Sequence, residues 1–282
     1  MFPFIKKIII KALVKLTAIF SNTKLGKIIN DQIIVDVMSR EKKIIHNGYE
    51  MSFCVPNSLN HFRIDTFSEK EPETLAWIDT LPHNSILWDV GANIGLYSIY
   101  AAKAKNCRVI AFEPSVFNLE LLARNIFLNN LQKQITIFPL ALSNILGPNS
   151  MRLTTKEWGG ALSSFGENVD WSGKPINDIF SFSTYGCSMD HAISIFNLPR
   201  PNFIKIDVDG IEHIILEGGK NILKTISGIL IEINDDFEEQ ATKAKKYLEN
   251  SGLVFDHKLQ GEILKYSTVG FANTYNQIWR RK

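Results

Sequence analysis

Residues 86–115 constrain the fold more than any other part of this chain, because an apolar run, a turn with two glycines and a helical pattern follow one another there. The run ILWDV at 86–90 is typical of a parallel strand that is buried on both faces. Gly91 lets the backbone turn tightly, and a helical pattern begins at Leu96. Strands and helices alternate in this way through most of the chain. We therefore expect a Rossmann-like, doubly wound and mostly parallel α/β sheet.

Two acidic residues, each at the end of a predicted strand, indicate what kind of ligand this strand–turn–helix unit binds. Glu113 follows the second strand, where such units present a carboxylate to ribose hydroxyls. A dinucleotide would require G-x-G-x-x-G to hold its pyrophosphate, but the turn reads D-V-G-A-N-I-G, and Asp89 would repel a pyrophosphate. The same carboxylate suits the ammonium of a methionine moiety. The pattern favours S-adenosylmethionine over a nicotinamide dinucleotide, although a plain turn with a capping acid would also read this way.

Four blocks of sequence, in this order, carry a resemblance to a known family. They are D-V-G-A-N-I-G-x-Y at 89–97, A-F-E-P-S at 111–115, L-A-L-S at 140–143 and K-I-D-V-D-G-I-E at 205–212. Together they resemble the FkbM family of S-adenosylmethionine-dependent methyltransferases over roughly residues 72–235. The resemblance implies a class I methyltransferase fold and O-methylation, commonly of sugar hydroxyls in bacterial polysaccharide biosynthesis or of secondary metabolites.

The expected cofactor-binding residues lie in the first three blocks. We expect the turn at 89–95 to hold the methionine end, Glu113 to hold the ribose, and Ala141 and Leu142 to lie beside the adenine. Ordinary loop packing would explain Ala141 and Leu142 equally well. The complete set is Asp89, Gly91, Ala92, Asn93, Gly95, Tyr97, Glu113, Pro114, Ser115, Ala141 and Leu142.

The expected catalytic residues are Asp207, Asp209 and Lys205, at the end of the strand 203–206. A sugar hydroxyl is a poor nucleophile at neutral pH, so a base or a metal must assist the loss of its proton. We expect Asp207 and Asp209 to position or deprotonate the acceptor. Lys205 would carry its charge inside an apolar strand, where an unpaired cation is costly, and Glu232 is its expected partner.

Structural roles compete with these functional ones. Asp209 and Glu212 are also spaced like a capping box for a helix that starts at Gly210. His213 reads as a surface or capping histidine rather than as a base. Mg²⁺ is possible but not favoured, and no metal ligands are predicted, because nothing in the spacing of the oxygen donors demands a metal. Those donors would be Asp207, Glu232 and Asn234.

Residues 144–187 show little periodicity and read as an insertion that covers the acceptor. We expect a strand at 150–154 followed by a loop hairpin. Trp158, Trp171 and Tyr185 could offer flat faces to a sugar ring, although each one fits a packing role better. The expected acceptor-binding residues are Trp158, Gly160, Ser163, Glu212 and Glu232.

Residues 1–27 carry six lysines and no acid, and they fit an amphipathic helix. Its apolar face would hold Ile5, Ile9, Ala12, Leu16 and Phe20. Lys7, Lys11 and Lys15 would form a stripe on the other face, where Ile10 and Val14 intrude. The apolar segment is too short and too interrupted to span a bilayer, and no signal-peptide cleavage site follows it. The helix either rests on an anionic membrane surface or packs on the catalytic domain or on a second subunit.

The residues between this helix and the first core strand lack a core of their own. We expect strands at 33–37 and 43–45, a hairpin turn at Asn47-Gly48, a strand at 49–55, and a helix at 67–80 that Ser68 caps. We therefore divide the chain into an N-terminal extension, 1–82, docked on a methyltransferase domain, 83–282.

Net charge and cysteine content give further evidence about the class of substrate and the compartment. A net charge of +2 gives no reason to bind nucleic acid, and acids at 207–209 would repel phosphate. Three widely spaced cysteines without a CxxC pair favour a reduced, cytoplasmic compartment. We predict a cytoplasmic enzyme, free or peripheral at the inner face of the membrane, that methylates a hydroxyl of a saccharide or glycoconjugate, with a homodimer possible. Its rivals are a nucleic-acid methyltransferase and a non-catalytic partner protein on the same fold.

Overall fold

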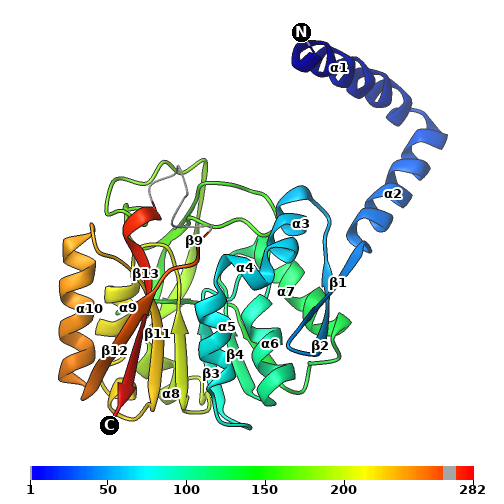
Figure 1. Ribbon diagram of the computed structural model, residues 1–282. Coiled ribbons are helices and arrows are strands. Elements are labelled where there is room, and N and C mark those ends of the chain that lie inside the picture. The colour runs from blue at the N-terminus through cyan, green and yellow to red at the C-terminus, as the bar shows by residue number, and fades with distance from the viewer. Residues whose placement is uncertain (1, 263–270) are drawn as a thin grey trace.

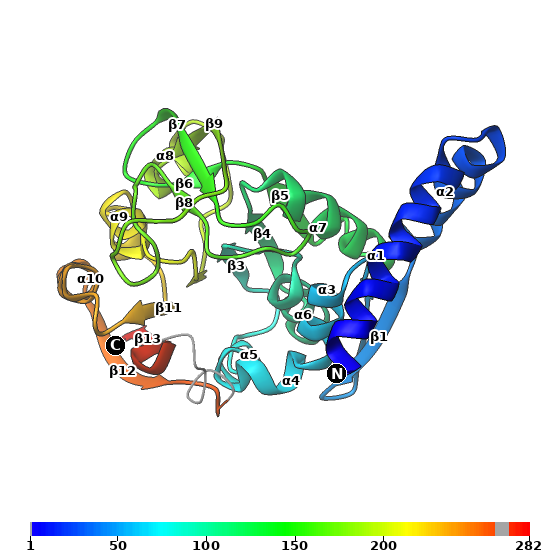
Figure 2. The ribbon, with the colours of Figure 1, turned by 90° about the horizontal axis from the view of Figure 1, so that it is seen from above.

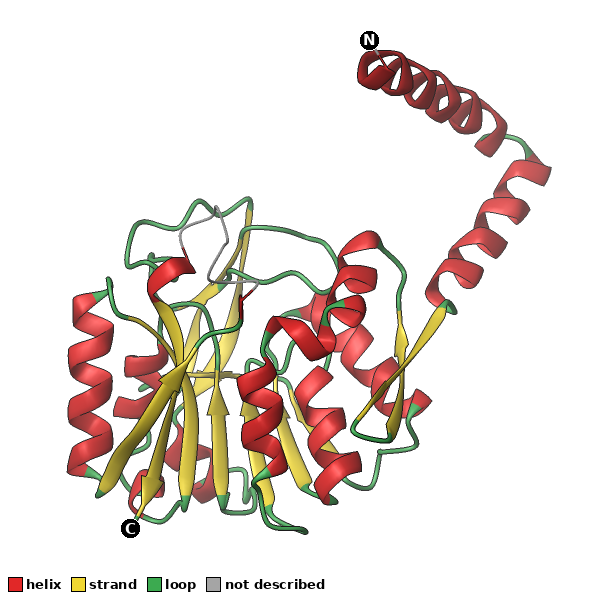
Figure 3. Cartoon of the chain, in the orientation of Figure 1, coloured by secondary structure: helices red, strands yellow, loops and turns green. Residues whose placement is uncertain are grey.

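The computed structural model describes residues 2–262 and 271–282. Within them, a central sheet has the strand order β12-β13-β11-β10-β3-β4-β5. Neighbouring strands are parallel except that β13 runs antiparallel to β11 and β12. These strands are β3 (Ile86–Val90), β4 (Arg108–Phe112), β5 (Ile135–Phe138), β10 (Phe203–Ile206), β11 (Gly228–Asn234), β12 (Leu253–Leu259) and β13 (Thr274–Arg281). The predicted doubly wound α/β sheet is confirmed (Figure 3).

Helices cover both faces of this sheet, and each face has its own apolar core (Figure 2). Because side chains alternate along a strand, Leu87 and Val109 point to one face, whereas Trp88 and Ile110 point to the other. The first face carries α5 (Pro72–Asp79), α6 (Leu96–Lys105) and α7 (Val116–Leu128). The second carries α8 (Met189–Ser194), α9 (Glu212–Glu217) and α10 (Glu238–Asn250). Burial on both faces explains why the strands read as nearly continuous apolar runs.

The strand order reverses beside β3. The chain runs outward from β3 through β4 to β5 and later returns to β10, on the other side of β3. In open α/β sheets, the crevice at the carboxyl ends of strands at such a reversal binds ligands. The register of the two central strands places Lys205 opposite Asp89. The segments that follow β3 and β10 therefore meet at one edge of the sheet.

The segment 144–187 is more regular than its sequence predicts. Four strands form a second sheet in the order β6-β9-β7-β8, and the predicted strand at 150–154 overlaps the second half of β7, which ends at Leu153. These strands are β6 (Ala141–Leu142), β7 (Gly147–Leu153), β8 (Ser164–Phe165) and β9 (Phe180–Cys187). Met151 and Phe165 are buried in the same core as Val90 of β3. The insertion is therefore a packed wall beside the strand ends.

The predicted hairpin at Asn47-Gly48 is confirmed, with His46 paired to Tyr49. Met51 and Phe53 of its second strand are buried in the same core as β3 and α6. The hairpin comprises β1 (Glu41–His46) and β2 (Tyr49–Cys54), and α3 (Ser58–Asp65) and α4 (Phe67–Lys70) follow it. Most of the predicted extension after residue 38 thus shares the core of the sheet, and a domain boundary at residue 82 stays a prediction.

Two predictions for this region are wrong. Residues 33–37, predicted as a strand, belong to α2 (Lys24–Met38), whose first turn is capped by the side chain of Thr23. The β-branched residues in this segment favour a strand. β propensity mostly reflects how side chains pack, however, so it does not by itself determine a strand. The helix predicted at 67–80 is broken before Pro72, which cannot continue the hydrogen bonding of α4. Ser68 accordingly lies within α4 and is not an N-cap.

Two helices, α1 (Phe2–Ser21) and α2, project from the body as an arm (Figure 1). α2 rises from β1, and α1 lies at an angle to it, above the body in the view of Figure 1. Every described side chain from Lys7 to Phe20 is exposed. The amphipathic helix is confirmed, but α1 does not pack on the catalytic body as one of our alternatives proposed. None of the described helices is long and apolar enough to cross a membrane.

Candidate active site

A cavity lies at the carboxyl ends of β3, β4 and β10. The residues that line it come from the turns after these strands and from the insertion. They are Val90, Gly91, Asn93, Phe112, Glu113, Pro114, Asn118, Leu140, Ala141, Leu142, Met151, Gly160, Ala161, Ser163, Phe165, Asp207, Val208, Asp209, Ile211 and Ile215.

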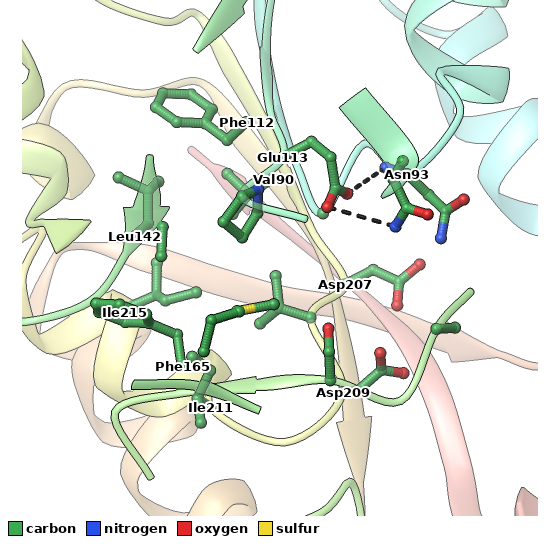
Figure 4. Close-up of a pocket in the computed structure, with 18 of the residues that line it drawn as sticks. Val90, Asn93, Phe112, Glu113, Leu142, Phe165, Asp207, Asp209, Ile211 and Ile215 are labelled. Carbon is green, nitrogen blue, oxygen red and sulfur yellow. Dashed lines mark hydrogen bonds between the residues drawn. The ribbon is translucent and has the colours of Figure 1, made fainter. Parts of the chain in front are cut away.

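The cavity has an apolar end and an acidic end (Figure 4). Leu142, Phe165 and Ile215 lie together at the apolar end. The carboxylates of Asp207 and Asp209 lie at the other end. Flat apolar groups are favoured at the first end, and positive charge is favoured at the second.

Glu113 ends β4 with a side chain that is only 4% exposed. Its two carboxylate oxygens accept hydrogen bonds from the backbone N–H groups of Asn93 and Ser115, each at 2.8 Å. Burial raises the pKa of Glu113 to about 7, against the opposing effect of these hydrogen bonds. The oxygen bonded by Ser115 also accepts from the side-chain amide of Asn118 at 3.4 Å, whereas the oxygen bonded by Asn93 keeps a second lone pair and can accept a hydrogen bond from a ligand's hydroxyl.

The turn from β3 to α6 requires left-handed backbone at Gly91 (φ 82°), Asn93 (φ 50°) and Gly95 (φ 88°). A Cβ on Gly91 would lie 1.9 Å from the carbonyl oxygen of Asp207, so no side chain fits there. Asn93 tolerates this conformation better than most residues do. Its side-chain amide donates a hydrogen bond to the carbonyl oxygen of Gly160 at 2.8 Å. The turn is therefore held in place by the backbone after β10 on one side and by the insertion on the other.

Lys205 is buried inside β10, behind the acidic end of the cavity. Its ammonium lies 3.1 Å from the carboxylate of Asp207 and 3.7 Å from that of Asp89. Burial alone would lower the pKa of Lys205, but Asp207, Asp89 and Glu71 outweigh burial and raise it above its ordinary value. The lysine is therefore charged and holds Asp207 in place. The predicted pairing of Lys205 with Glu232 is wrong, because the strand register sets Asp89 beside it.

Asp89 does not line the cavity, although the sequence suggested that it would contact the cofactor. Its side chain is 1% exposed, and one carboxylate oxygen accepts a hydrogen bond from the hydroxyl of Ser98 at 2.6 Å. The other oxygen has no hydrogen-bond partner among the described residues and faces Lys205. The structure thus places Asp89 one layer behind the cavity wall, as a partner of Lys205.

Glu71, at the start of α5, joins the same buried cluster and was missed in the sequence. Its carboxylate lies 2.8 Å from the ammonium of Lys70 and also bonds the hydroxyl of Tyr97. Burial opposes its charge, but Lys70 and Lys205 lower the pKa of Glu71 below its ordinary value. Burial and the neighbouring carboxylates raise the pKa of Glu232 well above its ordinary value. The cluster therefore favours a proton on Glu232 over a proton on Glu71.

Asp209 faces the cavity and is oriented by the insertion. One of its carboxylate oxygens accepts a hydrogen bond from the backbone N–H of Leu162 at 2.7 Å. Burial and the neighbouring carboxylate of Asp207 raise the pKa of Asp209 to about 6. At neutral pH the group is mostly ionised, yet it is a much better proton acceptor than an ordinary aspartate.

Glu212 and His213 occupy buried positions that differ from our expectations. Glu212 is 1% exposed, and its carboxylate accepts hydrogen bonds from the backbone N–H groups of Val208 (3.0 Å) and Gly210 (3.1 Å). α9 begins at Glu212 with Ile211 as its N-cap, and the side chain of Asp209 makes no capping bond. Glu212 does not bond the N–H of Asp209 either, so the prediction of a capping box is wrong. His213 is 5% exposed and contacts Phe237 edge to face, so the prediction of a surface histidine is wrong.

The structure brings some of the predicted site residues to the cavity and leaves others outside its wall. Those that line it are Gly91, Asn93, Glu113, Pro114, Ala141, Leu142, Gly160, Ser163, Asp207 and Asp209. Those that do not are Asp89, Ala92, Gly95, Tyr97, Ser115, Trp158, Lys205, Glu212 and Glu232. Trp158 instead lines a separate open groove with Phe117.

Several lining residues were missed, among them Asn118, Met151, Phe165, Ile211 and Ile215. The apolar ones carry no signal that distinguishes them from core residues. Asn118 lies in the first turn of α7, soon after Glu113. This closeness to an expected site residue is the one feature of the sequence that could have identified it. Its side-chain amide donates to the carbonyl oxygen of Gly160 at 3.1 Å, so it helps Asn93 to hold the insertion.

Within residues 2–262 and 271–282, no group of three His, Cys, Asp or Glu side chains is placed to hold a metal ion. The chemistry of the cavity itself suits a different kind of ligand. One buried carboxylate, Glu113, faces it between an apolar end and an acidic end. A nucleoside with a flat base, a ribose and a positive charge at the far end satisfies all three features.

Comparisons with known proteins point to one family. A family model described as Methyltransferase FkbM domain matches residues 89–266. The hexuronic acid methyltransferase AglP of Haloferax volcanii is 26% identical over 228 residues, which are 78% of this chain and 82% of that protein. The crystal structure of an FkbM methyltransferase from Methylobacillus flagellatus has a TM-score of 0.46 and 16% identity, and the match covers 79% of this chain and 52% of that one.

Proposed function

Because this chain belongs to the FkbM family of S-adenosylmethionine-dependent methyltransferases, we propose that it methylates a hydroxyl of a saccharide or glycoconjugate. The observation that carries the proposal is the polarised cavity, in which the carboxylates of Asp207 and Asp209 lie opposite an apolar end. The family gives the cofactor and the reaction class. The acceptor and the roles of individual residues are our proposal.

Three parts of the cavity fit the three parts of the cofactor. When bound, S-adenosylmethionine supplies a methyl group on a positively charged sulfur. We assign the adenine to the apolar end beside Ala141 and Leu142, and the ribose hydroxyls to Glu113. The methionine end lies along the turn that contains Gly91 and Asn93. The acidic end then faces the positive charge of the cofactor, which favours binding through simple electrostatic attraction.

Asp209 is the residue that we assign to the acceptor's proton. A hydroxyl oxygen that gains a methyl group must lose its proton, and a base with a pKa close to the working pH accepts it most effectively. Asp209 has such a pKa, faces the cavity and is held by the N–H of Leu162. Asp207 is fixed by Lys205, so it can orient the hydroxyl while Lys205 itself acts only as a positioning residue.

A saccharide acceptor fits better than a nucleic acid. The acidic end of the cavity would repel a phosphate backbone, and the net charge of +2 provides little long-range attraction for one. The relative AglP is named as a hexuronic acid methyltransferase, so saccharides are the first class to test. Neutral sugars belong in the panel beside uronic acids, because a uronate carboxylate would also be repelled at the acidic end. Gly160 and Ser163 of the insertion line the cavity and can contact such an acceptor.

The test is transfer of label from S-adenosylmethionine that carries tritium in its methyl group. We expect label to enter oligosaccharides, with uronic-acid-containing ones in the first panel, and not RNA or DNA. Chemical hydrolysis of the product then distinguishes an ether on a hydroxyl from a methyl ester. Label in nucleic acid, in an ester, or in no saccharide despite cofactor binding would overturn the proposed acceptor.

A further inference from the structure

Most of the surface of α1 is left uncovered by the described residues of the chain. Its apolar side chains are unusually exposed for a folded protein: Ile9 is 53% exposed, Leu13 56%, Leu16 63% and Ile19 69%. In Figure 1, α1 lies well away from the body, and only α2 adjoins it. Exposed apolar surface of this extent on one helix marks a contact site for something outside the chain.

The helix is two-sided, with different chemistry on each side. Successive helical residues are about 100° apart, so positions four apart fall on one side. Lys7, Lys11 and Lys15 are related in this way and form a basic stripe. Leu13, Leu16 and Phe20 lie on the opposite side, one and two turns apart. An amphipathic helix of this kind is suited to lie in the plane of an interface between water and an apolar phase.

Charge identifies the kind of surface that α1 would meet. Residues 1–27 contain six lysines, and the first acid of the chain is Asp31. A second copy of α1 packed on the apolar side would leave the lysines on the far side without counter-charges, whereas a bilayer with anionic lipids offers both hydrocarbon for the leucines and negative headgroups for the lysines. We propose that α1 binds flat on the surface of a bilayer that contains anionic lipids. This inference does not depend on the acceptor of methyl transfer.

The test uses the full-length protein in a vesicle flotation assay. The vesicles contain phosphatidylglycerol and phosphatidylcholine in equal parts, and vesicles of pure phosphatidylcholine serve as the comparison. We expect binding to the anionic vesicles and much weaker binding to the neutral ones. Salt should weaken the binding because it screens the lysines. Absence of binding to the anionic vesicles at low salt overturns the proposal.

Charge reversal tests whether α1 is the site. The triple variant Lys7→Glu, Lys11→Glu, Lys15→Glu should bind the anionic vesicles roughly 100-fold less tightly or worse, as expected for three lysines near a charged surface. The matched control, Lys133→Glu, Lys220→Glu, Lys246→Glu, changes the net charge equally at exposed positions on the body and should bind like the wild type. Equal losses in both variants would mean that net charge, and not α1, governs binding.

A second variant separates a membrane from a second subunit. Leu13→Asn, Leu16→Asn, Phe20→Asn removes the apolar side while keeping every lysine, and circular dichroism checks that its helices persist. Loss of vesicle binding with an unchanged mass by light scattering supports the proposal. A wild-type dimer that this variant dissociates, together with no vesicle binding by the wild type, would identify the apolar side as a subunit interface and overturn it.

Discussion

Asp209 combines an unusual backbone conformation with an unusual acidity. Its φ is 64°, and burial together with the Asp207 carboxylate raises its pKa to about 6. A proton acceptor works only when ionised. At saturating S-adenosylmethionine, where ionisation of Glu113 no longer limits cofactor binding, kcat/KM for the acceptor should therefore rise with pH through about 6 and level off above it. Replacing Asp209 with Asn should lower kcat about 100-fold and remove this inflection. Initial rates measured across the pH range would check both effects.

The choice of Asn at this position makes the experiment interpretable. Asn tolerates left-handed backbone and keeps an oxygen for the N–H of Leu162, so the fold around position 209 should persist. Asp170→Asn is a control on the insertion itself, outside the cavity wall. If the Asp209 variant retained the inflection near pH 6, another group would have to be the base.

Glu113 should matter to the cofactor and little to the acceptor. Its buried carboxylate lies at the end of β4 and is assigned to the ribose hydroxyls. Hydrogen bonds to a charged group contribute roughly 1.5–3 kcal/mol, so Glu113→Ala should raise the cofactor dissociation constant by about 10- to 100-fold. Titration calorimetry with S-adenosylhomocysteine measures this, and the exposed Glu120→Ala on α7 is the control. Equal losses of cofactor and acceptor binding would contradict our assignment.

At the scale of elements, the backbone of the β3–α6 turn lies so close to the backbone after β10 that no side chain fits between them. Gly91 and Gly48 both have φ near 80°, but only Gly91 faces another backbone segment. An added Cβ would meet the Asp207 carbonyl oxygen at 1.9 Å in the first case and nothing within 4 Å in the second. A side chain at Gly48 would therefore meet backbone strain alone, whereas a side chain at Gly91 would meet the same strain and a steric clash.

Alanine at the two glycines should have different consequences. Gly48→Ala should cost about 1–2 kcal/mol of unfolding free energy, because only left-handed strain opposes it. Gly91→Ala should cost about 1–3 kcal/mol more, because β10 must move, and it should also weaken cofactor binding. Urea unfolding followed by tryptophan fluorescence gives the first quantity, and cofactor titration gives the second. Similar losses of stability at both sites would show that the turn relaxes away from β10.

Most strands and helices of the core could be predicted from the sequence. Which strands lie next to each other in the sheet could not. The apolar runs at 86–90 and 203–206 identify two strands, because strands buried on both faces need such runs. Nothing in either run says that the strands are adjacent, so Lys205 was paired with Glu232 instead of Asp89. In the same way, Glu71 joins the site only because Pro72 breaks a helix that was predicted to continue.

The candidate site shows the same division. Residues in turns directly after strands, such as Glu113 and Asp209, were predictable because the carboxyl ends of parallel strands converge. Phe165 and Met151 reach the cavity through a second sheet whose strands were predicted only in part. Asp89 was expected at the cavity, but side chains alternate along a strand, so Val90 lines the cavity and Asp89 points to the other face, beside Lys205.

At the scale of the whole molecule, the chain consists of a packed body and a projecting arm, which should contribute very differently to stability. Along α1 every described side chain from Lys7 to Phe20 is exposed, whereas Met38, at the foot of α2, is buried in the core of the body. Deleting residues 1–21 should therefore change the free energy of unfolding by less than about 0.5 kcal/mol, as surface changes usually do.

The point substitution Met38→Ala should lower the same free energy by about 2–3 kcal/mol, because it empties a buried volume between α2 and β2. Urea unfolding of both variants, in the absence of lipid, compares the two predictions directly. A deletion that cost as much as the single methionine would mean that α1 folds back onto the body in solution. In that case the exposed leucines of α1 would be explained by an internal contact, and the arm would not be free to meet a membrane.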